Sequence, residues 1–228
     1  MKKIYKNCSE AIADIHDGAV VMVGAFATRG APENLILALR DKGVKDLTLI
    51  CNDCSGGWKY PLDADILVEN DQVKKVITSF ANFGSPKKIS NVEKRMLEGK
   101  LELEMVPQGT LAERVRAGGA GIGAFYAPAS VGTFLAKNKE VRKFEGREMV
   151  LEYPIKADFA LIKSHKADKY GNLVYRGSAQ NFNPLMAAAA KVTIVETENL
   201  LDVGELEPDE IKTPCIYVNR IVHVPEGK

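Results

Sequence analysis

DGAVVMVGAFATRGAP, residues 17–32, is the segment from which the architecture of the chain can be predicted. Residues 19–23 form a continuous apolar and β-branched run, which is typical of a strand buried on both faces of a sheet. Gly24 ends this run, and Pro32 suits the first turn of a helix, because its fixed φ and missing N–H cost nothing there. The segment therefore predicts a buried strand, a tight turn and a helix, which is the repeating unit of a parallel sheet.

The same order of strand and helix continues along the chain. Apolar or alternating runs predict further strands at residues 47–51, 73–79, 101–106, 148–153, 159–163, 173–176 and 192–196. Helices are predicted behind Pro32 and at residues 92–98, 110–117 and 184–190, with Thr110 and Glu113 as a capping box. Residues 118–132 are predicted to form a glycine-rich loop. We expect residues 1–228 to form a single α/β domain, an open, mostly parallel sheet with helices on both faces.

The composition excludes several classes of protein. In the 228 residues, 31 Lys and Arg against 30 Asp and Glu give a net charge of +1, so no basic excess favours binding to nucleic acid. No apolar run approaches the ~20 residues of a membrane span, and no signal peptide is predicted. Four cysteines make no disulfide framework in a chain of this length. We expect a cytoplasmic protein that binds neither nucleic acid nor membrane.

The turn after the first strand is a candidate ligand-binding loop. It lies at the carboxyl end of a predicted strand, where ligand crevices form in open α/β sheets. Gly24 and Gly30 would let its backbone approach a ligand, and the helix behind it would offer free N–H groups to an anion. The loop is neither a Walker A loop nor a dinucleotide-binding fingerprint. A tight turn without a ligand explains its composition about equally well.

Two amide side chains are predicted to lie at the same edge of the sheet. Asn52 directly follows the strand at 47–51, and Gln108 lies just beyond the strand at 101–106. A neutral amide can donate to a carbonyl oxygen that gains negative charge, which is the role of an oxyanion hole. Each side chain could instead close its own turn by bonding to nearby backbone.

The other reactive side chains indicate no catalytic centre. Cys51 and Cys54 form a CxxC pair, but no second Cys or His pair lies at metal-ligand spacing, so we expect structural thiols and no metal. His16, His165 and His223 lie in unrelated segments without the Ser and Asp neighbours of a hydrolase triad. The residues alone therefore predict a crevice with donors for an anion and an oxyanion, and no nucleophile. The apolar tail at residues 216–224 is expected to pack against the domain or against another chain.

Three long blocks of the sequence resemble the A subunit of the family I coenzyme A transferases, the 3-oxoacid or acetoacetate type. They are residues 17–32, PQGTLAERVRAGGAGIGAFY (107–126) and EYPIKADFALIKSHKADKYGNLVYRGSAQNFNPLM (152–186), in the family's order. The first block of the family carries Asp-Gly, an aliphatic strand, Gly-Gly-Phe and then Gly-x-Pro. Here Ala25 replaces the second of those glycines, Gly123 replaces a common proline, and Arg29 is unusual in the loop.

The resemblance implies a ping-pong transfer of coenzyme A (CoA) between an acetyl-, butyryl- or succinyl-CoA and a carboxylate such as acetoacetate. A glutamate of the partner, the family's B subunit, would carry CoA as a glutamyl thioester, in an A2B2 or larger assembly. CoA is then a substrate, and no permanently bound cofactor is expected. The CoA-binding residues that the resemblance implies are Gly24, Ala25, Phe26, Ala27, Thr28, Arg29 and Gly30. Two alternatives are a sugar-phosphate isomerase-like enzyme and a non-catalytic acyl-CoA-binding sensor.

Overall fold

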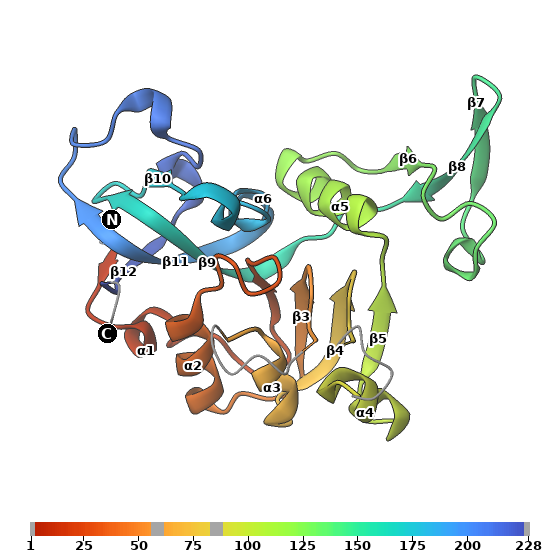
Figure 1. The fold of residues 1–228 in the computed structure, drawn as a ribbon, viewed down its shortest axis with the longest axis horizontal. Helices are drawn as coiled ribbons and strands as arrows, with labels where there is room; N and C mark the ends of the chain where they lie inside the picture. The colour runs from red at the N-terminus through yellow and green to blue at the C-terminus, as the bar shows by residue number, and fades with distance from the viewer. Residues whose placement is uncertain (1–2, 56–61, 83–88, 226–228) are drawn as a thin grey trace.

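Nine strands form the main sheet of the computed structural model, which describes residues 3–55, 62–82 and 89–225. Eight of them are parallel neighbours, in the order β1 (Ile4–Tyr5), β12 (Arg220–His223), β11 (Ala190–Leu201), β9 (Ala157–Asp168), β2 (Val20–Val23), β3 (Leu47–Cys51), β4 (Val73–Thr78) and β5 (Glu102–Met105). The ninth, β10 (Leu173–Val174), pairs with β9 antiparallel. The open, mostly parallel sheet predicted from the sequence is confirmed (Figure 1).

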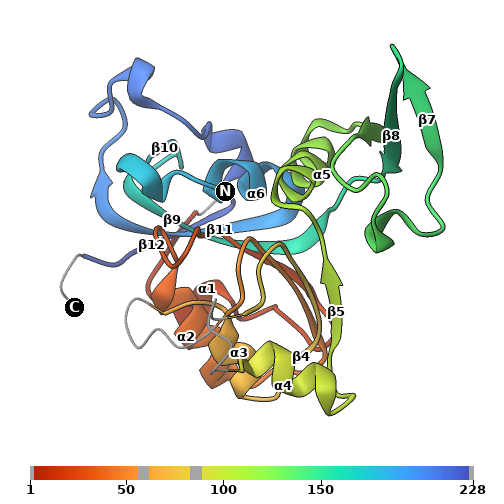
Figure 2. The same cartoon turned by 45° about the vertical axis from the view of Figure 1, so that its right-hand side comes forward.

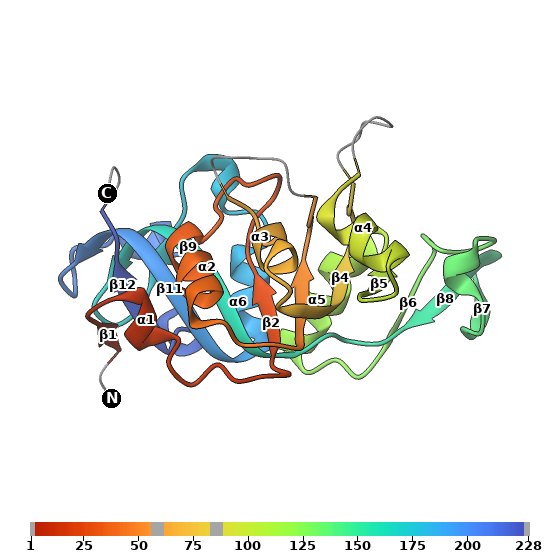
Figure 3. The same ribbon diagram turned by 90° about the horizontal axis from the view of Figure 1, so that it is seen from below.

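Helices cover both faces of this sheet, as Figures 1 and 3 show. One face carries α1 (Cys8–Ala11), α2 (Glu33–Lys42), α3 (Asp65–Glu69) and α4 (Asn91–Leu97), and the other carries α5 (Gln108–Ala120) and α6 (Asn183–Ala189). Val21 and Val23 of β2 pack in the core beneath α2, whereas Met22 packs in the core beneath α5 and α6. Burial on both faces explains why the strand is apolar throughout. Within the described ranges, no helix is long and apolar enough to cross a bilayer.

Helix α5 begins two residues before the predicted start. Pro107 is its N-cap residue, and the Pro107 carbonyl accepts the N–H of Leu111 at 2.8 Å. Thr110 therefore lies inside the first turn and is buried, so the predicted capping box at Thr110 is wrong. As a consequence, Gln108 is a helical residue rather than a loop residue.

The same helix continues through part of the predicted glycine-rich loop, up to Ala120. A Cβ atom on Gly118 would lie 2.0 Å from the carbonyl oxygen of Ile155, and one on Gly119 would lie 2.9 Å from the Cβ of Ala188. The two glycines thus let α5 pack closely against the backbone leading into β9 and against α6. The prediction of a loop from residue 118 onward is wrong, because these glycines serve helix packing rather than chain flexibility.

A second, antiparallel sheet projects from the main body at the right of Figures 1 and 2. It contains β6 (Phe125–Ala127), β8 (Arg147–Glu152) and β7 (Val141–Phe144), in the order β6-β8-β7. From the sequence only β8 is predicted. Strand β7 is exposed along its whole length, so its residues show no apolar periodicity, and Glu145 and Gly146, both at positive φ, turn the chain into β8.

The C-terminal tail packs against its own domain. Strand β12 lies between β1 and β11, and Val218, Ile221 and Val222 are all at most 2% exposed. Ile216 is 77% exposed. The apolar pattern of residues 216–224 is therefore explained mainly by the sheet, and little of it is left for a partner.

Candidate active site

Neighbouring parallel strands bring the predicted amide side chains to one edge of the sheet. Asn52 follows β3, Ser79 follows β4, and Gln108 begins α5 shortly after β5. The carboxyl ends of parallel strands meet at one edge, where crevices form. There a cavity of about 420 Å³, here called the Gln108 cavity, is lined by Phe26, Ala27, Asn52, Asp53, Ser55, Ser79, Phe80 and Gln108.

A short chain of hydrogen bonds orients Gln108. Its Nε2 donates to Asn52 Oδ1 at 2.9 Å. Ser79 Oγ lies 3.0 Å from the same oxygen and 2.7 Å from the backbone carbonyl oxygen of Asn52, so its one hydrogen has two acceptors on Asn52. Asn52 Nδ2 donates to Asp53 Oδ1 at 2.9 Å. An ionised carboxylate only accepts hydrogen bonds, so Asp53 fixes which end of the Asn52 amide faces Gln108.

The two amides therefore differ in what they can do. Asn52 is 3% exposed and engaged at both ends of its amide, whereas Gln108 is exposed at the cavity. An amide nitrogen carries two hydrogens, so the bond to Asn52 leaves the second hydrogen of Gln108 for a ligand. Gln108 is the candidate oxyanion donor, and Asn52 is its positioning residue.

The candidate loop is a tight hairpin. Phe26 and Arg29 exchange backbone hydrogen bonds of 3.1 and 2.9 Å, and the two residues between them, Ala27 and Thr28, have φ values of 45° and 70°. Positive φ is uncommon outside glycine and unusual for a β-branched residue such as threonine. The Ala27 N–H donates to Asp53 Oδ1 at 2.8 Å, which ties this strained turn to the Asn52–Gln108 pair. The 26–29 hairpin is thus held in place by the same carboxylate that orients the amides.

The two glycines of the loop, Gly24 and Gly30, are needed for close packing against α6, a role that the sequence does not reveal. A Cβ atom on Gly24 would lie 2.0 Å from Asn183 Oδ1, and one on Gly30 would lie 2.5 Å from the carbonyl oxygen of Ala179. Asn183 is fully buried, and its Nδ2 donates to the carbonyls of Gly30 and Ala179 while its Oδ1 accepts the Lys163 N–H. On the side where a Cβ would lie, these glycines make room for α6, which is a structural reason for them beside the predicted approach of a ligand.

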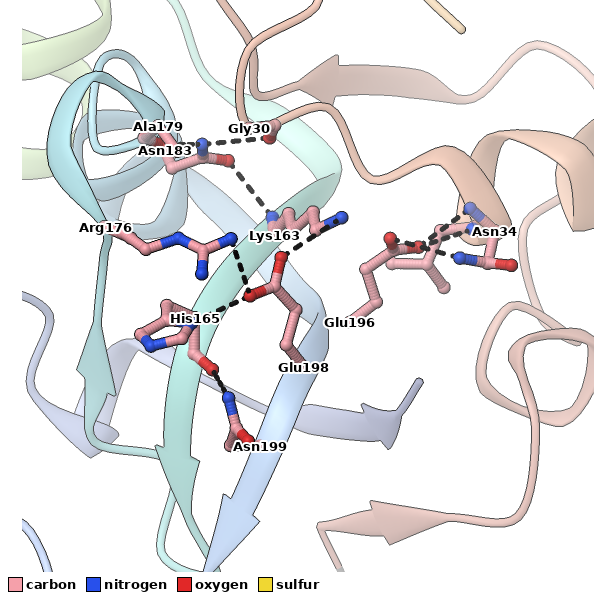
Figure 4. A network of polar contacts seen from close by, with 11 residues as sticks. Gly30, Asn34, Lys163, His165, Arg176, Ala179, Asn183, Glu196, Glu198 and Asn199 are labelled. Carbon is pink, nitrogen blue, oxygen red and sulfur yellow. Dashed lines mark hydrogen bonds and ion pairs between the residues drawn. The ribbon is translucent and has the colours of Figure 1, made fainter. Parts of the chain in front are cut away.

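The helix N-terminus behind the loop is already occupied by a protein carboxylate. Pro32 provides no side-chain cap for α2, and Glu196 Oε2 from β11 instead accepts the N–H groups of Asn34 and Leu35 at 2.9 and 3.0 Å (Figure 4). Burial raises the pKa of Glu196 to about 7, against the effect of these hydrogen bonds and of the Lys163 charge. The expectation that this helix offers free N–H groups to an external anion is therefore wrong.

No cysteine or histidine is among the described residues that line the Gln108 cavity. Cys51 and Cys54 are buried free thiols. His16 is bonded to its neighbouring backbone, and His165 pairs with Glu198 Oε2 at 2.7 Å, a contact 33 residues apart that no sequence pattern indicates. In the part of the chain that the structure describes, no three His, Cys, Asp or Glu side chains are grouped to hold a metal ion.

An oriented amide in a cavity at the carboxyl edge of a parallel sheet makes the Gln108 cavity a candidate small-molecule site of this α/β fold. The sequence matches the family model described as "Coenzyme A transferase" over residues 5–224. It is 48% identical to the A subunit of the probable succinyl-CoA:3-ketoacid coenzyme A transferase of Bacillus subtilis, over 97% of this chain and 90% of that protein. It is 45% identical to the A subunit of the 3-oxoadipate CoA-transferase of Pseudomonas putida, over 98% of this chain and 94% of that protein.

The fold has a solved counterpart. Glutaconate coenzyme A-transferase from Acidaminococcus fermentans superposes with a TM-score of 0.85 at 24% identity, over 99% of this chain and 76% of that one. The chain belongs to the coenzyme A transferase family, and within it the chain is of the A-subunit type.

Proposed function

We propose that this chain is the A subunit of an enzyme that moves CoA between a short-chain acyl-CoA and a carboxylate. Its relatives are named for succinyl-CoA with 3-ketoacids and for 3-oxoadipate, which supports a 3-oxo acid such as acetoacetate as one substrate. The observation that carries the proposal is the exposed Gln108 amide, oriented by Asn52 at the mouth of a cavity. The reaction needs a hydrogen-bond donor of this kind at its carbonyl oxygens.

The proposed chemistry proceeds through a glutamate of the B subunit. Its carboxylate oxygen bonds to the thioester carbonyl carbon, the C–S bond breaks, and the CoA thiolate leaves with the electron pair. The thiolate then attacks the glutamyl carbonyl of the resulting anhydride, and the first carboxylate leaves. The second acid reverses these steps. Each addition places negative charge on a carbonyl oxygen, to which the Gln108 N–H donates, beside the half-exposed rings of Phe26 and Phe80.

The lining of the cavity supports a nucleophile on a partner. Among the described lining residues, the single carboxylate is Asp53, and it already accepts hydrogen bonds from Asn52 and Ala27. Both bonds go to Oδ1, so this carboxylate has a structural role in holding the hairpin and orienting Asn52. We therefore infer that the nucleophile belongs to the B subunit, with which this chain forms a hetero-oligomer, A2B2 or larger. We also propose that this enzyme works in the cytoplasm without a resident cofactor.

The test is a thioester-exchange assay of this chain, its partner and the mixture against a panel of acids. The acids are acetate, butyrate, succinate, acetoacetate and 3-oxoadipate, each offered with succinyl-CoA or acetyl-CoA as donor. We expect exchange by the mixture and none by either chain alone. A mixture that binds acyl-CoA without exchanging it would contradict the proposal in favour of a sensor. Thermal stabilisation by ribose phosphates, with none by CoA, would favour an isomerase.

A further inference from the structure

Two phenyl rings are exposed beside the Gln108 amide. Phe26 and Phe80 both line the Gln108 cavity, and each is 45% exposed. Small-molecule sites combine apolar walls with a few polar groups that fix the orientation of the ligand. In the proposed reaction the Gln108 N–H donates to the carbonyl oxygen of an acyl group, so these rings are the apolar surface available to the carbon chain of that group.

The two rings are attached to different parts of the fold. Phe26 belongs to the 26–29 hairpin, within the loop for which the resemblance implies contact with CoA. Phe80 lies just beyond the end of β4, where it pairs with Asp53 in an isolated parallel bridge. The three blocks of sequence that carry the resemblance do not include Phe80. A role for this ring is therefore a separate question from the binding of CoA by the loop.

Hydrogen bonds fix the backbone at Phe80. Its carbonyl oxygen accepts the N–H of Cys54 at 2.9 Å and lies 3.3 Å from the Thr78 hydroxyl. The preceding residue, Ser79, donates its N–H to the Asn52 carbonyl at 3.0 Å. The base of the ring is thus tied to the segment after β3, and a substrate cannot push this backbone aside without breaking these bonds.

The Phe80 ring and the Gln108 amide come from neighbouring strands. Phe80 follows β4, and Gln108 begins the helix after β5, which pairs with β4. Asn52 links the two positions, because its Oδ1 accepts Gln108 Nε2 at 2.9 Å and lies 3.0 Å from Ser79 Oγ. Phe26 follows β2, which β3 separates from β4. Along the sheet edge, Phe80 is therefore attached nearer to Gln108 than Phe26 is.

We propose that Phe80 limits the length of the acyl chain that the Gln108 cavity accepts. An acyl group whose carbonyl oxygen accepts from Gln108 extends its chain along the cavity until the chain meets the ring. The ring leaves room for an acetoacetyl or butyryl group and excludes a chain that is two carbons longer. The substrate class is then unbranched short-chain acids, including short 3-oxo acids. This inference rests on the proposed function, because it concerns the group that the reaction transfers.

The chain-length preference of the two-chain enzyme tests the inference. With acetyl-CoA as donor, kcat/KM is measured for acetoacetate and for 3-oxohexanoate, which differ by two methylene groups alone. We expect the parent enzyme to favour acetoacetate. Phe80→Ala should raise the ratio of kcat/KM for 3-oxohexanoate to kcat/KM for acetoacetate by about tenfold or more, which is the discrimination that one methylene group gives in an apolar pocket. Phe80→Leu fills part of the space and should give an intermediate ratio.

Phe134→Ala is the matched control, since the Phe134 ring is 80% exposed and lies outside the Gln108 cavity. Its ratio should stay within about twofold of the parent ratio. Both acids are measured on one preparation, so the ratio does not depend on the fraction of folded enzyme, and misfolding cannot produce a gain with the longer acid.

Two outcomes would overturn the inference and leave the proposed function in place. One is a parent enzyme that takes both acids equally well, and the other is exchange of acetoacetate with an unchanged ratio in Phe80→Ala. Failure of the parent enzyme to exchange any acid would instead overturn the proposed function, and this inference with it.

Discussion

Replacement of Gln108 by alanine is expected to lower kcat of the two-chain enzyme by about 10²–10³, with little change in the affinity for acyl-CoA. Loss of one oxyanion donor typically has this effect, because the negative charge that it stabilises develops on the way to the transition state and is absent from the bound substrate. The Gln108 side chain is exposed at the cavity, so its truncation leaves the core of the domain intact. Steady-state exchange kinetics, with melting curves of each variant, measure the effect.

Two further variants separate donation from positioning. Gln180→Ala, the same change at an exposed glutamine outside the Gln108 cavity, should leave kcat unchanged. Asn52→Ala should lower kcat, and the double variant with Gln108→Ala should be no slower than Gln108→Ala alone, since Asn52 acts through Gln108. Near-native turnover in Gln108→Ala would contradict the assignment.

Replacement of Gly24 by alanine is expected to destabilise the domain by roughly 3 kcal/mol or more, as overpacking of a rigid site does. The added methyl group would lie 2.0 Å from Asn183 Oδ1 and 2.8 Å from Asn183 Cγ. Asn183 is fully buried and bonded to three backbone groups, so it cannot turn away without losing those bonds. For a domain of this size the melting temperature should fall by about 6–12 °C.

Gly123→Ala is the matched control, because a Cβ atom there would have nothing within 4 Å. It should melt close to the parent. The same pair of variants decides why Gly24 is needed: a Gly24→Ala variant that melts like the parent but no longer binds CoA would restore ligand approach as the reason and contradict packing against α6.

The positions of most strands of the main sheet could be predicted, because their signals are local. Residues 19–23 are apolar throughout, since β2 is covered by α2 on one face and by α5 and α6 on the other. The placement of Asn52 and Gln108 at one edge follows from the parallel order of β3, β4 and β5. Their different roles could not be predicted, because the Asp53 contacts that separate them depend on the folded hairpin.

The features that could not be predicted depend on contacts between distant residues or on exposed strands. The cap of α2 is Glu196, which lies 162 residues from Asn34 in the sequence, so no local capping pattern reveals it. Gly24 and Gly30 resemble ligand-loop glycines, yet it is α6, about 150 residues further on, that fills the space beside them. Strand β7 of the projecting sheet could not be predicted, because it is exposed along its length and has no buried face to give its residues an apolar period.

In the proposed reaction this chain orients the reacting group, while the nucleophile belongs to its partner. The most direct measurement mixes both chains with acyl-CoA, reduces the covalent intermediate with borohydride and locates the modified glutamate by peptide mass. We expect a label on one glutamate of the partner and none on residues 1–228 of this chain. A modified glutamate within this chain, or CoA exchange by this chain alone, would contradict the proposed division of roles.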